Sequence, residues 1–375
     1  MIILNKFLQN TLASREIRVN DIRNLYMERL LLNLTFFTIL SVLILPGCVR
    51  GLSEPDIIDP ELKKVFVINQ GTPGQNNPSL TVYNPVSNEI IQSAYQLANG
   101  RNFSGRPVDM FLSAGDAYIL LQNQNGLEVI QTSNYKSRGN LSLQSFSPPD
   151  RVALNHVRTR AYISHSTDSI ISVINLADLS LMNTIKVPGE PAGLSMVRNL
   201  LVITLYNRSE GNSILLYNVN TNEFENEIEV GMGPFEVMTD FQDRIWVLCE
   251  GSFDRGIPGS LYRVDTDLFV ASRWIQFPAV AARMTWDGSL YIYVIAGRNI
   301  QRVFTPNPNQ VTSWLQAAEG TVLRGIQADG ASGEVFTVVN ISGQQNGELR
   351  HYNRSGELIT STPVGINPHR IIFEY

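Results

Sequence analysis

Short apolar strands recur along this chain at a nearly constant spacing. They read VFVIN, AYILLQN, AYISHS, LVITLYN, IWVLCEG, LYIYVIAG and VFTVVN, and they start at Val65, Ala117, Ala161, Leu201, Ile245, Leu290 and Val335. The intervals between successive starts are 52, 44, 40, 44, 45 and 45 residues. Turn residues separate the strands, and no amphipathic helix is predicted between them. The pattern predicts seven repeats of one small β-sheet.

Each repeat carries further strands. A second strand type follows at Leu80, Leu127, Ile171, Ile214, Leu261, Ile300 and Leu349, and most copies end in Asn or Asp, which open turns by bonding their own backbone. A polar strand comes next, clearest at 182–187 and 225–230, as expected for a solvent-facing edge. A Gly/Pro turn then leads into an apolar inner strand such as VDMFLS. Four strands per repeat predict an all-β fold, a seven-bladed β-propeller with four-stranded blades.

The two ends of the repeat array predict how the ring closes. The array enters at Val65 in the middle of a blade and ends in PHRIIFEY, which has the pattern of an inner strand. We therefore expect the C-terminal strand to complete the first blade, with residues 65–375 forming one propeller domain. The recurring aromatics are expected to pack between blades; they are Phe66, Tyr118, Tyr162, Trp246, Tyr291 and Phe336.

The N-terminal region indicates the location of the domain. An apolar run at residues 30–45 ends in Leu45-Pro46-Gly47-Cys48, which matches a lipobox and is short for a transmembrane helix. Dual or further acylation of Cys48 gives stable membrane anchoring. Val49 in place of Asp favours the outer membrane, with exposure at the cell surface left open. A buried core helix at 30–45 is the alternative. The predicted organisation is an upstream extension at 1–26, a signal peptide at 27–47 and a lipidated, flexible tether at 48–64.

Charge and cysteine usage exclude some partners. Residues 1–47 contain five Lys or Arg and three Asp or Glu, so the remainder has 24 basic and 31 acidic residues and a formal charge of −7. Binding to nucleic acid is therefore disfavoured, and we expect a monomer. With Cys48 lipidated, Cys249 has no disulfide partner, and its apolar strand predicts buried packing.

Charged residues recur where the inner strands begin. Alignment of the Gly/Pro turns places Asp109, Arg151, Gly193, Glu236, Arg283, Arg324 and Arg370 at equivalent positions, six of them charged, around one mouth of the channel. Two interpretations remain open: salt bridges between blades, or an Arg-rich funnel for an anionic or amide-rich ligand. Long polar loops at 69–79, 250–260 and 340–348 are expected on the same face, with aromatics that could stack on a planar ligand. The candidate ligand-binding residues are Arg151, Tyr206, Phe235, Glu236, Phe253, Arg283, Arg324, His369 and Arg370.

Catalytic signatures are absent from the sequence. The four histidines, at 156, 165, 351 and 369, lack metal-ligand spacing, and no HExxH, GxSxG or paired-carboxylate motif occurs. Metal-dependent propeller lactonases require Glu, Asn and Asp converging on the channel, and nothing in the spacing singles out Glu236 and Asp109 for that role. We predict no catalytic residue, no metal and no cofactor.

Several segments resemble known propellers. The VxVxN strands, the VSVIN segment and the VPGEPAG turn resemble YVTN-type repeats over 65–375. The first-blade block VFVINQGTPGQNNPSLTVYNP and the fifth-blade block IWVLCEGSFDRGIPGSLYRVD are similar to surface-exposed, cobalamin-binding (BtuG-like) lipoproteins of Bacteroidetes, whereas RNIQRVFTPNPNQVTSW departs from the repeat. The resemblance implies an outer-membrane lipoprotein that captures a corrinoid for a TonB-dependent transporter. A protein–protein scaffold and a propeller hydrolase or lactonase are the alternatives.

Overall fold

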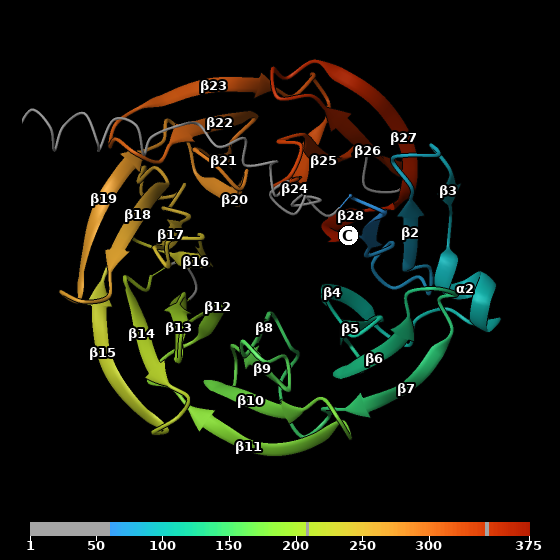
Figure 1. The fold of residues 1–375 in the computed structure, drawn as a ribbon, viewed down its shortest axis with the longest axis horizontal. Coiled ribbons are helices and arrows are strands. Elements are labelled where there is room, and N and C mark those ends of the chain that lie inside the picture. Colours follow the sequence, from blue (N-terminus) through green and yellow to red (C-terminus); the bar gives the residue numbers. More distant parts are fainter. Residues whose placement is uncertain (1–60, 208–209, 342–344) are drawn as a thin grey trace, which may run out of the picture. The chain divides into compact units, whose positions relative to one another are not determined.

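The computed structural model describes residues 61–207, 210–341 and 345–375. The predicted signal peptide, Cys48 and the tether up to residue 60 lie outside the described residues. Within them, the chain forms seven four-stranded antiparallel sheets arranged in a ring (Figure 1). No helix in these ranges is both long enough and apolar enough to cross a membrane. The predicted all-β, seven-bladed β-propeller is confirmed.

Every blade runs from an inner strand at the channel to an outer strand at the rim (Figure 1). The inner strands are β28 (Pro368–Glu374), β4 (Arg106–Ser113), β8 (Val152–Leu154), β12 (Pro191–Val197), β16 (Pro234–Thr239), β20 (Ala281–Trp286) and β24 (Val322–Ala328), for blades one to seven in order. The second strands are β1 (Lys64–Asn69), β5 (Asp116–Gln122), β9 (Arg160–His165), β13 (Leu200–Leu205), β17 (Ile245–Cys249), β21 (Tyr291–Ala296) and β25 (Val335–Asn340).

The outer half of each blade is more polar. The third strands are β2 (Ser79–Tyr83), β6 (Gly126–Gln131), β10 (Ile170–Asn175), β14 (Ser213–Asn218), β18 (Ser260–Asp265), β22 (Asn299–Phe304) and β26 (Asn346–Tyr352). The outer strands are β3 (Ile90–Ile91), β7 (Ser137–Ser142), β11 (Ser180–Lys186), β15 (Glu223–Glu229), β19 (Val270–Gln276), β23 (Val311–Gln316) and β27 (Leu358–Ile366). In β11 and β15 nearly every side chain is exposed, as predicted for the blade edge. Blade six, whose sequence departs from the repeat, is a regular four-stranded sheet.

The C-terminal strand closes the ring as predicted. β28 pairs antiparallel with β1, and the order of this sheet is β28-β1-β2-β3. Lys63 N–H donates to the Glu374 carbonyl at 2.8 Å, and Lys64 Nζ lies 2.9 Å from Glu374 Oε2. Leu62 is buried. The last residues of the predicted tether therefore already belong to the packed blade.

Apolar side chains hold the blades together in seven clusters, each shared by neighbouring blades. Tyr118 of β5, for example, packs with Ala161 and Ile163 of β9. In blade six the register equivalent of Tyr118 is Tyr293, which is 2% exposed, whereas the predicted Tyr291 is a partly buried member of the same cluster. The correction follows from the strand register, since the Leu290 start of that repeat was set two residues too early.

Blade one departs from the other six. A short helix, α2 (Ala94–Asn99), follows the two-residue β3, although the sequence pattern predicted no helix between strands. The helix packs Tyr95 against Phe103, with ring centroids 4.0 Å apart, and the Tyr95 hydroxyl donates to Glu128 Oε1 at 2.8 Å. A helix of six residues is too short to show a 3.6-residue period. It accounts for the longest of the intervals between repeats.

Candidate functional site

One position on the inner strands builds a polar layer across the channel. In six of these strands the register shifts by an extra residue near the start: Pro107 pairs with Leu121, and Asp109, two residues later, with Leu120. Such a β-bulge re-aims the next side chain. By register, the residues after the bulge and their equivalents in the other blades are Asp109, Arg151, Gly193, Glu236, Arg283, Gly325 and Arg370. We call this set the polar layer.

The register corrects the predicted alignment in blade seven. Arg324 occupies the bulge and is exposed, and Gly325 takes the layer position. A Cβ at Gly325 would lie 2.8 Å from the His369 carbonyl oxygen, and one at Gly193 would lie 2.7 Å from the Phe235 carbonyl oxygen. Neighbouring inner strands approach too closely there for any side chain. The polar layer therefore has five charged residues, where the sequence predicted six.

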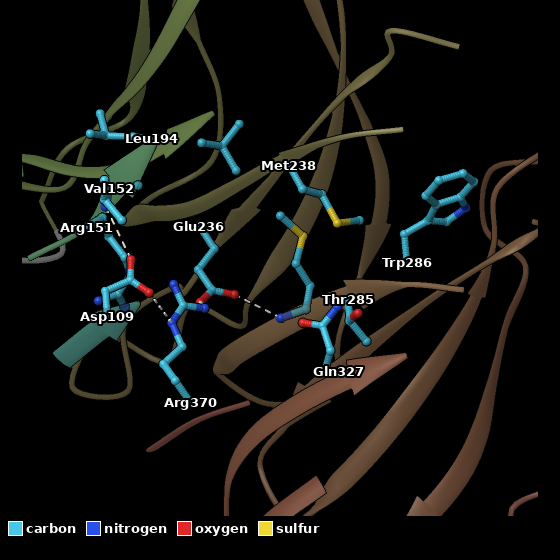
Figure 2. A pocket seen from close by; sticks show the side chains of 13 residues that line it. Asp109, Arg151, Val152, Leu194, Glu236, Met238, Thr285, Trp286, Gln327 and Arg370 are labelled. Carbon is cyan, nitrogen blue, oxygen red and sulfur yellow. Dashed lines mark hydrogen bonds and ion pairs between the residues drawn. The ribbon is translucent and has the colours of Figure 1, made fainter. Parts of the chain in front are cut away.

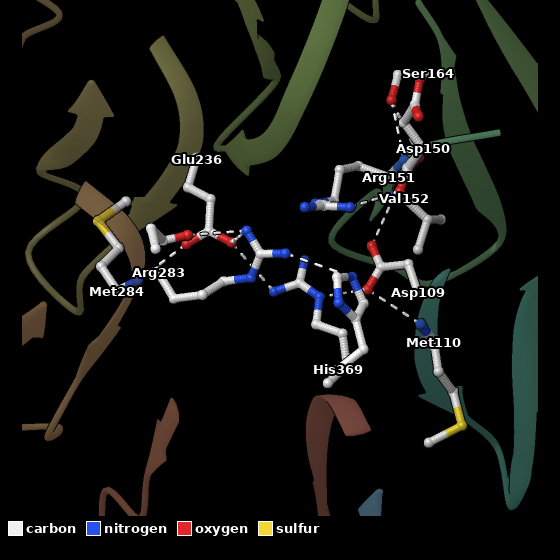
Figure 3. A network of polar contacts seen from close by, with 12 residues as sticks. Asp109, Met110, Asp150, Arg151, Val152, Ser164, Glu236, Arg283, Met284 and His369 are labelled. Atoms are coloured by element: carbon white, nitrogen blue, oxygen red, sulfur yellow. Dashed lines mark hydrogen bonds and ion pairs between the residues drawn. The ribbon is translucent and has the colours of Figure 1, made fainter. Parts of the chain in front are cut away.

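Ion pairs between blades connect four of the five charged residues of the layer (Figure 3). Arg370 Nε lies 3.1 Å from Asp109 Oδ1, and Arg370 Nη1 lies 3.5 Å from Glu236 Oε1. Arg283 Nη1 lies 3.4 Å from the same Glu236 oxygen. Both carboxylates also accept backbone hydrogen bonds, Asp109 from Val152 N–H at 3.2 Å and Glu236 from Met284 N–H at 2.9 Å. The salt-bridge interpretation thus holds for Arg370 and Arg283.

Arg151 is the exception among the three arginines of the layer. Its Nη1 donates to the Asp150 carbonyl at 2.9 Å, and its buried Nε, like that of Arg283, has no hydrogen-bond partner among the described residues. No carboxylate of the described residues forms an ion pair with Arg151. Burial, and next to it the charge of Arg370, lower the pKa of Arg151. A guanidinium nevertheless stays protonated in proteins, so Arg151 carries a positive charge without a paired carboxylate.

The other titratable groups set the net charge of the layer. Burial lowers the pKa of Arg283 to about 10, opposed by Glu236, and it remains charged at neutral pH. Burial also acts against the charged form of Arg370, but Asp109 and Glu236 outweigh it and raise its pKa. His369 is neutral, because burial and then Arg283 hold its pKa well below the usual value. Within the layer, three cations against two carboxylates leave one excess positive charge. Asp150, whose charge also acts on Arg151, lies outside the layer and accepts from Ser166 N–H at 3.1 Å.

A cavity of about 290 Å³ lies on one side of the layer (Figure 2). Its polar end is formed by Asp109, Arg151, Glu236 and Arg370. Apart from Gly193 of the layer, the other lining residues lie one to three positions further along the inner strands. These include Met238, Met284, Trp286, Thr285 and Gln327. The cavity therefore faces the ends of the inner strands, where turns such as 240–244 and 287–290 lead to the second strands. We call this side the strand-end face.

The long polar loops lie on the opposite, strand-start face, because they connect second strands to third strands. Here the rings of Tyr206 and Phe235 meet edge to face at 6.5 Å, and Phe253 is 86% exposed. Arg283 Nη2 lies 3.4 Å from His369 Nε2. Of the predicted ligand-binding residues, Arg151, Glu236 and Arg370 line the cavity, whereas Tyr206, Phe235, Phe253, Arg283, Arg324 and His369 do not.

Sequence reasoning missed the apolar wall of the cavity. Met238, Met284 and Trp286 belong to inner strands that the sequence predicted. Their alternation with packing residues indicates only that they face the channel. No signal in the sequence says which side of the polar layer is hollow.

Two further groups bear on possible chemistry. Cys249 is fully buried, as predicted, and burial raises the pKa of its thiol to about 12. Among the described residues no group of three or more His, Cys, Asp or Glu side chains is placed to hold a metal ion.

Comparison with known proteins supports the fold. No protein-family model matches the sequence, and no curated protein matches it. Among solved structures, a quinoprotein alcohol dehydrogenase-like protein from Bacteroides thetaiotaomicron superposes with a TM-score of 0.66 at 12% identity, over 83% of this chain and 78% of the other. A protein from Lactobacillus plantarum gives 0.63 at 13% identity, over 84% and 100%. A Bacteroides fragilis protein described provisionally as a 6-phosphogluconolactonase gives 0.61 at 10% identity, over 84% and 100%. Likeness at this identity shows the propeller fold alone.

Proposed function

We propose that this propeller is an outer-membrane lipoprotein that captures a corrinoid on its strand-start face and passes it to a TonB-dependent transporter. The observation that carries the proposal is the set of aromatic and cationic side chains on that face from successive blades. Tyr206 belongs to blade four, Phe235 and Phe253 to blade five and Arg324 to blade seven; Arg283 of blade six, between them, is already paired with Glu236. Convergence of side chains from several blades is how one face holds a broad ligand.

Ligand size favours this face over the cavity. A corrin ring with its amide side chains is much larger than a space of about 290 Å³. The long loops offer an open surface instead. Guanidinium groups donate directed hydrogen bonds to amide oxygens, and exposed aromatic rings pack on a flat macrocycle. The exposed Arg324 and Phe253 supply one group of each kind.

The anchoring part of the proposal rests on the lipobox ending at Cys48 and on the residue after it. A lipid anchor confines the protein to two dimensions near a membrane transporter, which raises the effective concentration of captured ligand at its entrance. Residue 49 is Val and not Asp, which supports anchoring in the outer membrane.

Calorimetric titration of the purified protein with cyanocobalamin and with cobinamide tests the proposal. We expect saturable binding that weakens at least about tenfold in the double variant Arg324→Ala/Phe253→Ala, because both side chains are exposed and their loss leaves the fold intact. Arg273→Ala, an exposed arginine on the outer strand β19, is the matched control and should bind like the native protein. No saturable heat with either corrinoid would reject the vitamin and favour a protein–protein scaffold.

A further inference from the structure

The cavity on the strand-end face has the features of a separate small-molecule site. Residues from all seven inner strands line it, so its shape is fixed by the ring itself and not by loops. Its volume of about 290 Å³ is close to the lower end of the range for ligand pockets, about 300 Å³. The occupant must therefore be small.

The charges at the polar end of the cavity favour a ligand group with one negative charge. Arg370 and Arg283 are already paired with Asp109 and Glu236, whereas no carboxylate of the described residues forms an ion pair with Arg151. Figure 3 shows the guanidinium of Arg151 extending toward the middle of the cluster. A monoanion would neutralise the single excess charge of the layer. A dianion such as a phosphate monoester would leave a buried negative charge uncompensated.

The side chains at the opposite end of the cavity favour a flat apolar group. Trp286, Met238 and Met284 form this wall, and Figure 2 shows Trp286 and Met238 on the side away from Asp109 and Arg370. Phe241, which is 65% exposed, stacks on Trp286 with ring centroids 5.3 Å apart and planes at 22°. A half-exposed aromatic pair beside methionine side chains is a surface on which a planar ring packs favourably.

We propose that this cavity binds a small aromatic monocarboxylate, with its carboxylate on Arg151 and its ring against Trp286 and the two methionines. Carboxylate and guanidinium match in a two-pronged geometry, and a hydrogen bond between two charged groups is stronger than one between neutral groups. The ligand enters past Phe241, between the turns of the strand-end face. The site lies across the polar layer from the corrinoid face, so either proposal can fail without the other.

Indole-3-acetate is the probe, because it combines a planar ring with one carboxylate. Binding is followed by equilibrium dialysis on the purified protein and by calorimetric titration, because the indole ring of the probe fluoresces as tryptophan does. We expect saturation in the micromolar to low millimolar range. The uncharged analogue indole-3-acetamide should bind at least about tenfold more weakly, since it lacks the charge-assisted bonds to Arg151.

Two variants locate the site. Arg151→Met keeps an unbranched stem, removes the guanidinium and its charge, and should weaken indole-3-acetate binding at least about tenfold. Phe241→Ala removes an exposed ring and should weaken it severalfold, with the same loss for both probes. Their matched controls are Arg273→Met and Phe224→Ala, an exposed arginine and a half-exposed aromatic on outer strands, which should bind like the native protein.

The proposal is overturned by absence of saturable binding, by equal affinity for acid and amide, or by variants that bind as well as their controls. If circular dichroism shows that Arg151→Met does not fold, Phe241→Ala and the acid-to-amide ratio decide the outcome, because both leave the polar layer unaltered.

Discussion

The two faces of the channel are made by the same seven inner strands, yet they differ in kind. On the strand-start side, long loops and residues at the bulges, such as Phe235 and Arg324, surround an open surface. On the strand-end side, tight turns surround a small cavity with an apolar wall. The polar layer between them neutralises two of its three arginines and leaves Arg151 facing the cavity. The position of an inner-strand residue relative to the bulge thus decides whether its side chain lies on the broad strand-start face or at the cavity.

Removal of residues 368–375 should abolish both faces at once and is expected to have the largest effect. The deletion removes β28, leaves β1 with an unpaired edge and takes away Arg370 and His369. We expect loss of the cooperative thermal transition and rapid cleavage in limited proteolysis. Tyr375→Ala, which removes only the terminal side chain, is the control. A truncated protein that melts like the native one would show that the ring closes without this strand.

Replacement of Glu236 by Leu should weaken the layer itself. Glu236 is 6% exposed and bridges Arg283 and Arg370, so its loss leaves two cations poorly compensated in a buried setting. We expect the free energy of unfolding to fall by about 3 kcal/mol in urea denaturation. Glu223→Leu, at an exposed position of β15, should change it by less than about 0.5 kcal/mol. Equal effects of the two substitutions would contradict the structural role assigned to Glu236.

Acid should destabilise the strand-start side through His369, with the smallest of the three effects. Its pKa is depressed in the folded protein by burial and by Arg283, Arg151, Arg370 and Arg106, whereas in the unfolded chain it is about 6.5. The unfolded state therefore binds the extra proton first, and stability falls as pH drops below about 6.5.

Thermal unfolding at pH 7.5 and pH 5.5 measures this dependence. Acidification from pH 7.5 to pH 5.5 lowers the free energy of unfolding, and we expect this decrease to be about 1 kcal/mol smaller in His369→Asn. The exposed His156 provides the control substitution, His156→Asn, which should leave the difference between the two pH values unchanged. His165 contributes in the same direction, since burial lowers its pKa as well, so the loss should shrink in His369→Asn without vanishing. An unaltered pH dependence in His369→Asn would refute the assignment.

The sequence by itself determined the number of blades, the strand order within each and the closure of the ring, because a fixed repeat length and a two-residue alternation are local properties of the chain. The sequence alignment also located all five charged residues of the layer. Besides Asp109, these are the candidate ligand-binding residues Arg151, Glu236, Arg283 and Arg370. It misplaced Arg324 and Tyr291, since a bulge or a shifted strand start moves a residue along the register without altering the hydrophobic pattern.

Only the tertiary structure decided which arginines are paired, which blades need glycine and which side of the layer is hollow. Pairing depends on distances between blades far apart in sequence, as for Arg370 and Glu236. The glycines at 193 and 325 reflect how closely adjacent inner strands approach. The cavity beside Trp286 forms because seven strands converge around one axis, and no single repeat contains that information.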